Sequence, residues 1–523
     1  MTRTIVIGGG ISGLATAALL AREGHRVTLV EQRAEVGGRA GVWERDGFRF
    51  DTGPSWYLMP EVFDHFYRVL GTTAEQQLEL VQLDPGYRVY GEGHADPLDV
   101  SASVDENLEL FERVEPGSAV RLAKYLDRSR EIYELAKQHF LYTTFQRLLP
   151  VMRGGVAGRI PRLLQLLLEP LDSLTRRTVR DNRLRQILGY PAVFLGSSPK
   201  LAPSMYSLMS HLDMVDGVYY PLGGFTRVIE SIADLARAQG VDIRTSTPVT
   251  RIVVDEGGRA TGVEVTDAAG KKTTVLEADV VVSTADLHHT ETALLDRAEL
   301  RTFPEEYWQN RTAGPGALLL MLGVSGELPE LEHHTLFFAK DWNKGFQAIF
   351  GDQRIPDTLS LYVSKTSGVD STAPEGAENL FVLVPLPADP AIGRGGIDGA
   401  GDAAVEALAD RVIAQIAGWA GIPDLAERVV LRRTVAPGDF AADLNAWKGS
   451  ALGPAHTLRQ SAFFRAGDVS THVSNLYYAG SSTIPGIGLP MCLISAELVL
   501  KRLRGDTSTT PVAESLRVTR TSA

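Results

Sequence analysis

Apolar positions follow two different periods along the chain, and both occur within the first thirty residues. A short apolar run at 4–7 stops at three glycines, a helical pattern follows through Leu14 and Leu20, and a second apolar run spans 27–30. Short continuous apolar runs are typical of buried strands, whereas a spacing of three and four residues is typical of helices. The order therefore predicts a strand, a tight turn, a helix and a second strand, which together form a βαβ unit.

The rest of the chain divides into segments with contrasting patterns. A helix-rich stretch with many leucines and arginines begins at Pro116 and continues to about residue 215. Strands are expected within 85–110, 241–285, 315–390 and 475–480, and helices at 401–420 and 493–504. The tail beyond Gly505 is rich in Ser, Thr and Arg, and we expect it to be disordered.

Composition and charge narrow the class of protein. The 523 residues are 44% hydrophobic, which is enough for two or three domains with large cores. A net charge of −12 argues against a nucleic-acid-binding protein. The single cysteine, Cys492, permits no internal disulfide and fits a reducing compartment. Because no signal peptide is apparent and the longest apolar runs, such as Ala317–Val324, have the length of buried strands, we expect a cytoplasmic protein.

The turn of the βαβ unit carries the pattern G-x-G-x-x-G. In such a turn Gly8 permits the tight bend, Gly10 lets a pyrophosphate approach the backbone, and Gly13 lets the helix pack closely on the strand. An acid at the end of the second strand is suited to bind the ribose hydroxyls, and the helix N-terminus favours phosphate. The dinucleotide site is therefore expected to contain Gly8, Gly10, Ile11, Ser12, Gly13 and Glu31.

The segment after the second strand favours FAD over NAD. A second glycine pair and an arginine, Gly37, Gly38 and Arg39, follow Gln32 within a few residues. This continuation resembles a motif of the amine-oxidase-like flavoprotein superfamily. The resemblance implies that Gln32, Gly38 and Arg39 lie against the flavin or its pyrophosphate. The alternative interpretation is a plain turn at 37–38.

Two distant segments are expected to complete the same site. Residues 476–483 form a strand that ends in small residues, and 484–491 open a helix whose N-terminus favours an anion. The resemblance implies that the C-terminal segment closes over the isoalloxazine ring and that a middle strand meets the adenine. The residues concerned are Val249, Gly480, Ser481, Pro490 and Met491. FAD is expected to bind non-covalently, with Cys492 as a small buried apolar side chain.

From residue 2 to about 504 the chain resembles the bacterial-type phytoene desaturases of carotenoid synthesis. The segments that carry this resemblance are GFRFDTGPS at 47–55, YYPLGG at 219–224, APEG at 373–376, DLNA at 443–446, QSAFFR at 460–465 and the loop 480–490. The resemblance implies that Gly53, Pro54 and Ser55 also belong to the cofactor site. The chain has Ile484 where many members have histidine, which bears on the substrate and product and not on the flavin.

The expected fold class is α/β. A discontinuous Rossmann-type FAD-binding domain carries an inserted β-rich substrate domain and a helical membrane-facing region. The boundaries are 1–84, 217–292 and 471–504 for the FAD-binding domain, 85–116 and 293–470 for the substrate domain, 117–216 for the helical region and 505–523 for the disordered tail.

The resemblance implies an FAD-dependent desaturation in carotenoid biosynthesis. Phytoene would be converted to lycopene or to a less desaturated product by hydride transfer to the flavin, which oxygen or a quinone would reoxidise. Neither a metal nor a nucleophilic side chain is obviously useful, because the cofactor supplies the difficult chemistry. The alternatives on the same scaffold are a carotenoid isomerase or ketolase, an amine oxidase, and a carotenoid carrier without activity.

No catalytic base is assigned from the sequence. Asp51 is expected to brace a turn, Glu375 and Arg465 to cap loops or form salt bridges, and His288 and His289 to cap a helix. Each of these structural roles explains its residue at least as well as catalysis does.

A long hydrocarbon substrate also implies a membrane. At about 0.8 kcal/mol per CH₂, moving a forty-carbon hydrocarbon into water costs on the order of 30 kcal/mol. The stretch from Arg147 to Arg185 contains nine arginines and only three acidic residues, which gives it a net charge of +6. Leucines are interleaved with these arginines. Such a basic amphipathic stretch favours peripheral attachment to a lipid surface, and the alternative is a core helix pair with a solvated basic face.

Overall fold

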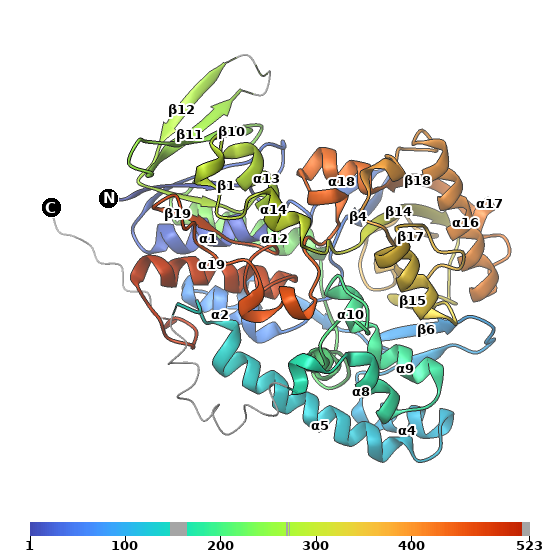
Figure 1. Ribbon diagram of the computed structural model, residues 1–523. Helices are drawn as coiled ribbons and strands as arrows, with labels where there is room; N and C mark the ends of the chain where they lie inside the picture. The colour runs from blue at the N-terminus through green and yellow to red at the C-terminus, as the bar shows by residue number, and fades with distance from the viewer. Residues whose placement is uncertain (147–164, 268–269, 271, 515–523) are drawn as a thin grey trace.

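The computed structural model describes residues 1–146, 165–267, 270 and 272–514. A parallel five-stranded sheet, with strand order β19-β13-β1-β2-β9, forms the centre of one half of the molecule (Figure 1). Its strands are β1 Arg3–Ile7, β2 Arg26–Val30, β9 Asp242–Arg244, β13 Val280–Ser283 and β19 Leu476–Tyr478. The N-terminal, middle and C-terminal parts of the chain therefore meet in one sheet.

Helices with apolar faces cover this sheet. Small side chains such as Ala17 and Ala18 are fully buried in α1, which lets α12 and α19 pack closely against it. The helices of this half are α1 Ile11–Arg22, α2 Pro60–Val69, α3 Ala74–Gln77, α12 Gly224–Ala238, α13 Leu287–His289, α14 Glu305–Gln309 and α19 Leu489–Arg504. The sequence placed the start of α19 at 493, but the helix begins earlier because Pro490 is compatible with a first turn.

Smaller sheets accompany the parallel sheet. An antiparallel sheet of β10, β11 and β12 packs through Ile252, Val263 and Val265 on the face of the parallel sheet that carries Ile5 and Val281. Two-stranded ribbons pair β3 with β4 and β5 with β8. The bounds are β3 Val42–Arg45, β4 Phe48–Asp51, β5 Leu80–Gln82, β8 Tyr219–Pro221, β10 Val249–Val254, β11 Ala260–Thr266 and β12 Thr273–Glu277.

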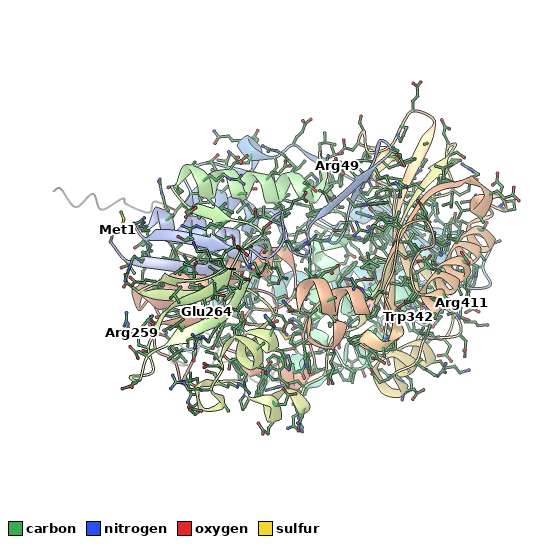
Figure 2. The ribbon with its side chains drawn as sticks, turned by 90° about the horizontal axis from the view of Figure 1, so that it is seen from above. Met1, Arg49, Arg259, Glu264, Trp342 and Arg411 are labelled. Carbon is green, nitrogen blue, oxygen red and sulfur yellow. The ribbon has the colours of Figure 1, made fainter. Side chains whose placement is uncertain are left out.

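A seven-stranded sheet with the order β18-β14-β17-β16-β15-β6-β7 forms the second half. Its neighbours are antiparallel except β15 and β6, which run parallel. The strands are β6 Tyr87–Gly91, β7 Leu98–Val100, β14 Gly316–Ser325, β15 His334–Phe338, β16 Leu361–Ser364, β17 Ala377–Leu386 and β18 Val429–Val435. Seen from above, Met1, Arg259 and Glu264 lie on the half with the parallel sheet, and Trp342 and Arg411 lie on the other half (Figure 2).

Strand β14 lies inside this sheet, between β18 and β17, and its sequence is continuously apolar. Leu318, Leu320 and Leu322 point to one face and pack on helix α16 (Ala403–Ala420), whereas Leu319 and Met321 point to the opposite face. Because side chains alternate along a strand, a strand buried on both faces has no polar positions. The predicted buried strand at 317–324 and the predicted helix at 401–420 are both confirmed.

A group of helices lies below both sheets in Figure 1. Their bounds are α4 Val104–Val114, α5 Ser118–Ala136, α8 Leu171–Thr178, α9 Asn182–Gly189, α10 Pro191–Phe194 and α11 Leu208–Met214. Three further helices lie by the seven-stranded sheet: α15 Trp342–Phe346, α17 Leu425–Arg428 and α18 Pro437–Leu444. Helix α4 was not expected within the strand-like stretch 85–110. It forms because Ser103 caps it by accepting from the amide of Glu106, and Leu110 and Phe111 bury its apolar face.

The start of the C-terminal tail is packed, although its composition predicted disorder from Gly505. The ammonium of Lys501 donates to the carbonyl oxygens of Tyr142 (2.7 Å), Ser508 (2.9 Å) and Thr510 (2.7 Å). The amide of Val512 donates to Glu497 at 2.7 Å, and the Val512 side chain is buried. The composition of the tail did not predict this packing, because the contacts depend on only two side chains, those of Lys501 and Val512. Residues 515–523 of the predicted tail lie outside the described residues.

Within the described ranges, none of the helices has the length and apolarity required to cross a lipid bilayer. Of the basic stretch 147–185, only residues from 165 onward are described. There Leu171, Leu174 and Leu184 belong to the hydrophobic core, whereas Leu168 is 65% exposed. The described part therefore matches the core-helix alternative for most of its leucines.

Candidate functional site

A cavity of about 570 Å³ is lined by residues of both halves of the molecule. It brings together the segments that the sequence analysis selected. The predicted cofactor residues that line it are Gly8, Gly10, Ile11, Ser12, Glu31, Gln32, Gly38, Arg39, Gly53, Pro54, Ser55, Val249, Gly480, Ser481, Pro490 and Met491. Gly13 is outside the lining. The individual contacts of these residues with a cofactor stay predictions.

The glycine-rich turn has the geometry that a dinucleotide needs. Gly8 adopts a φ of +99°, a region that favours glycine, and the turn leads directly into α1. Gly10 is the N-cap residue and provides no side-chain hydrogen bond, so amides of the first turn are left for a ligand. Gly13 lies behind the turn, where a Cβ atom would overlap the carbonyl oxygen of Gly8. Its place outside the cavity fits the packing role expected of it.

Glu31 ends β2 inside the cavity. Its carboxylate accepts from the amide of Gly9 at 2.6 Å and from the amide of Arg33 at 2.8 Å. A carboxylate has about four acceptor positions, so two hydrogen bonds leave capacity for ribose hydroxyls. The acid is thus oriented by the backbone of the glycine-rich turn itself.

Arg39 is the strongest indication of an anionic ligand. Its Nε and Nη2 atoms are buried and have no hydrogen-bond partner, and burial lowers the pKa of the guanidinium. A buried donor without a partner costs on the order of 1–3 kcal/mol, and more when it is charged. Beside Gly38 and the N-terminus of α1, this cation fits the pyrophosphate of FAD.

The C-terminal loop 480–490 is held from behind by Arg465. Its guanidinium is buried and donates to the carbonyl oxygens of Thr483 (3.0 Å), Gln460 (3.2 Å) and Pro454 (3.2 Å), and also to that of Ser481. Burial lowers the pKa of Arg465 to about 10. The predicted structural role of Arg465 as a loop brace agrees with these contacts.

A histidine reaches this loop from another segment, although Ile484 replaces the histidine common in the resembled family. The amide of Ile487 donates to His456 Nε2 at 3.1 Å, and burial lowers the pKa of His456 well below 6.5. The neutral ring therefore carries its proton on Nδ1, which donates to the Tyr206 hydroxyl at 2.5 Å. Both side chains line the cavity, so the Tyr206 hydroxyl keeps its own proton for a second partner.

Several residues considered for catalysis have structural roles. Asp51 accepts from the amides of Phe225 (2.8 Å) and Thr226 (3.2 Å) and so braces the start of α12. The helix after β13 is capped by Asp286, which accepts from the amides of His288 (3.0 Å) and His289 (3.3 Å). The expectation that the histidines themselves cap that helix is wrong, because their amides and not their rings take part.

Beyond the polar part, the cavity wall is mainly apolar and aromatic. Trp56 follows the predicted cofactor residues Gly53–Ser55 and packs with Phe194 (5.2 Å between ring centroids) and Tyr190 (5.9 Å). The other aromatic and aliphatic side chains of this part include Phe140, Phe145, Leu212, Phe338, Trp342, Phe346, Ile349 and Tyr362. One cavity therefore joins a polar cradle for a dinucleotide to a wall suited to a hydrocarbon.

Cys492 lines the cavity but is a poor nucleophile. The side chain is buried, and burial raises the pKa of its thiol. Because the thiolate is the reactive form, the environment favours an inert thiol, as expected from the sequence.

Sequence reasoning missed Tyr190, Tyr206, Asp213, His456 and Tyr362. None of them lies in a motif or on a regular apolar period, and they come from segments far apart in the chain. Only the fold brings them to the cavity or, for Asp213, into contact with a residue that lines it.

The chain is similar to several characterised groups of proteins. The profile of the family described as flavin containing amine oxidoreductase matches residues 11–499. A carotenoid 3,4-desaturase of Haloarcula japonica is 40% identical over 504 residues, which cover 96% of this chain and 98% of the relative. A zeta-carotene-forming phytoene desaturase of Myxococcus xanthus is 34% identical over 503 residues, which cover 96% and 93%. A structure of putrescine oxidase bound to putrescine has a TM-score of 0.59 at 16% identity, covering 96% of this chain and 99% of the other, and this likeness concerns the fold alone.

Proposed function

Because the chain belongs to the family of flavin-containing amine oxidoreductases, we propose that it is a carotenoid desaturase. It is an FAD-dependent oxidoreductase, and its substrate is a long hydrophobic polyene with adjacent saturated carbons. The two desaturases reported above support this assignment through near full-length similarity. The two relatives are named for different desaturation reactions, so the number of desaturation steps is a property to be measured.

The observation that best supports the proposal is that the polar part of the cavity, suited to the dinucleotide, is continuous with its aromatic wall. Trp56, Phe194 and Phe338 give this wall the apolar contact area that a long hydrocarbon requires. FAD, when bound, supplies an acceptor for a hydride from an unactivated C–H bond. The protein neutralises the cofactor phosphates with Arg39, holds the loop 480–490 through Arg465, and excludes water with aromatic side chains.

Attachment to a lipid surface follows from the substrate. A hydrocarbon of this size must enter from a bilayer, and the cavity wall includes Phe145, whose ring lies 6.3 Å from that of Phe463. Phe463 and Phe464 are each 49% exposed, their tilted rings lie 4.3 Å apart between centroids, and both follow the cavity-lining Ala462. This aromatic pair is our candidate for the point of contact with lipid, on the cytosolic side of the membrane. Oxygen or a quinone dissolved in the same bilayer would accept the electrons.

Expression in a bacterial host that accumulates phytoene tests the proposal. Pigments are extracted, separated by chromatography and identified by absorbance and mass. A desaturase gives a coloured polyene that is two hydrogens lighter for each step. An isomer of unchanged mass indicates an isomerase, an added oxygen indicates a ketolase, and unchanged phytoene beside FAD-loaded protein contradicts a phytoene substrate.

A further inference from the structure

One buried carboxyl group lies a single hydrogen bond behind the aromatic wall of the cavity. Tyr190, between α9 and α10, lines the cavity, and its hydroxyl donates to Oδ2 of Asp213 at 2.5 Å. Tyr87 donates to the same oxygen at 3.3 Å from outside the lining. Asp213 is 3% exposed, and its Oδ1 atom is buried with no hydrogen-bond partner.

The other buried carboxylates of the described chain have conventional partners. Asp468, Glu406 and Asp439 pair with arginines at 2.6, 2.7 and 3.0 Å. Asp286, Glu31, Glu291 and Glu497 accept from backbone amides. Asp213 enters no ion pair among the described residues. A carboxylate without a cation in such surroundings is destabilised and binds a proton more readily.

Burial raises the pKa of Asp213 to about 7, and the hydrogen bonds from Tyr190 and Tyr87 offset this only in part. The titratable groups that face it are Tyr87 on β6, Tyr190, and Tyr125 on α5, which also interacts with Arg128. Burial holds the pKa of each tyrosine above 10, so all three are neutral at pH 7. An acid that titrates near neutral pH is suited to accept protons during turnover.

We propose that Tyr190 and Asp213 together accept the proton that the desaturation releases. Bound FAD would supply the acceptor for a hydride from one substrate C–H bond. The adjacent C–H bond loses a proton while its electron pair forms the new double bond. That proton passes to the Tyr190 oxygen as the phenolic proton of Tyr190 moves to Asp213 Oδ2. The phenol ends neutral, and the carboxylate becomes a carboxylic acid that must lose its proton before the next turnover.

The location supports this assignment and rests on the proposed desaturation. Tyr190 packs against Trp56, and Trp56 directly follows the predicted cofactor residues Gly53–Ser55. The aromatic faces of Trp56 and Phe194 also favour positive charge that develops in the polyene. Tyr190 lines the cavity and would contact the substrate there, and Asp213 acts through it as a positioning and accepting group.

Rapid mixing of anaerobic holoenzyme with phytoene in detergent micelles tests the pair. The rate of flavin bleaching in the wild type rises with pH through about 7 and is constant above it, because only ionised Asp213 accepts. Tyr190→Phe and Asp213→Asn each lower the rate at pH 8 at least about 100-fold, and the double variant is no slower, because the two act as a unit. The matched control is Tyr67→Phe, which removes a buried phenol that does not line the cavity and does not face Asp213, and which retains the wild-type rate within twofold. A Tyr190→Phe rate within threefold of the wild type overturns the proposal.

Infrared difference spectra of the holoenzyme without substrate give a readout independent of turnover. The wild type shows a carboxylic-acid carbonyl band that disappears near pH 7, and Asp213→Asn lacks it. A wild type without such a titrating band overturns the proposal even where the variants fail to fold. If wild-type enzyme leaves phytoene unchanged while the band titrates, phytoene is not the substrate, whereas the titrating carboxyl group of Asp213 behind Tyr190 is confirmed.

Discussion

A Cβ atom on Gly13 would stand 1.9 Å from the carbonyl oxygen of Gly8, so the first helix and the turn before it are packed as closely as two backbones allow. Gly13→Ala therefore must displace α1 from the turn. We expect the purified variant to contain at least tenfold less FAD, measured by the ratio of flavin to protein absorbance. Gly418→Ala is the matched control, because a Cβ there meets no atom within 4 Å on an exposed helix position. The control should bind FAD fully and gain about 0.5–1 kcal/mol of stability.

Arg39 should account for much of the affinity for the cofactor phosphates. Charge-assisted hydrogen bonds contribute about 1.5–3 kcal/mol each, so Arg39→Met is expected to weaken FAD binding by about 10- to 100-fold. Titration of apoprotein with FAD, followed by quenching of flavin fluorescence, measures the change. Arg237→Met, on the exposed side of α12, should leave the dissociation constant unchanged. Equal affinities of Arg39→Met and the wild type would mean that the pyrophosphate lies elsewhere.

The raised pKa of Asp213 makes a prediction for stability as well as for catalysis. Its ordinary value of 3.8 applies to the unfolded chain and about 7 to the folded one, so the unfolded state releases this proton first as pH rises. Stability is therefore lost between these two pH values and stays lower above about 7. Asp213→Asn cannot ionise, so its melting temperature relative to the wild type should be at least about 2 °C higher at pH 8 than at pH 5. A difference that does not change with pH would show that Asp213 is not protonated in the folded protein at pH 5.

Phe463 and Phe464 should contribute to lipid binding if they form the point of contact. Burial of a phenylalanine in an apolar phase is worth about 1.5–3 kcal/mol, so the double serine variant should bind anionic vesicles at least tenfold more weakly. Co-sedimentation with vesicles of phosphatidylglycerol and phosphatidylcholine measures this. Val430→Ser is the control, because Val430 is 63% exposed on the opposite half of the molecule. The proposed contact is wrong if both variants sediment like the wild type.

The parts of the fold that were predictable depend on local patterns. The βαβ unit could be recognised because Gly8, Gly13 and Glu31 lie within thirty residues, and the buried strand β14 because its apolar run is uninterrupted. Segments as distant as β1 and β19 could be assigned to one site only through resemblance to known flavoproteins. Helix α4 was missed because its cap and two buried residues are a weak signal within a polar stretch.

The remaining features depend on contacts that the spacing of apolar residues along the sequence does not reveal. Lys501 orders the start of the tail through three carbonyl oxygens, and carbonyl positions cannot be predicted from composition. Tyr190 and Asp213 are separated by 23 residues, one directly after α9 and the other in α11, and they meet only in the folded chain. His456 reaches the loop 480–490 from outside the motif in which a histidine was expected. Tertiary packing, and not local sequence, creates these groups.

Anaerobic mixing of the FAD-loaded enzyme with phytoene, followed by mass analysis of the extracted polyene, tests the central claim most directly. The account predicts that the flavin absorbance bleaches in a single turnover and that a product two hydrogens lighter appears in equal amount. Flavin that stays oxidised while the polyene keeps its mass, with FAD bound and phytoene present in excess, would contradict the assignment of this chain as a phytoene-type desaturase.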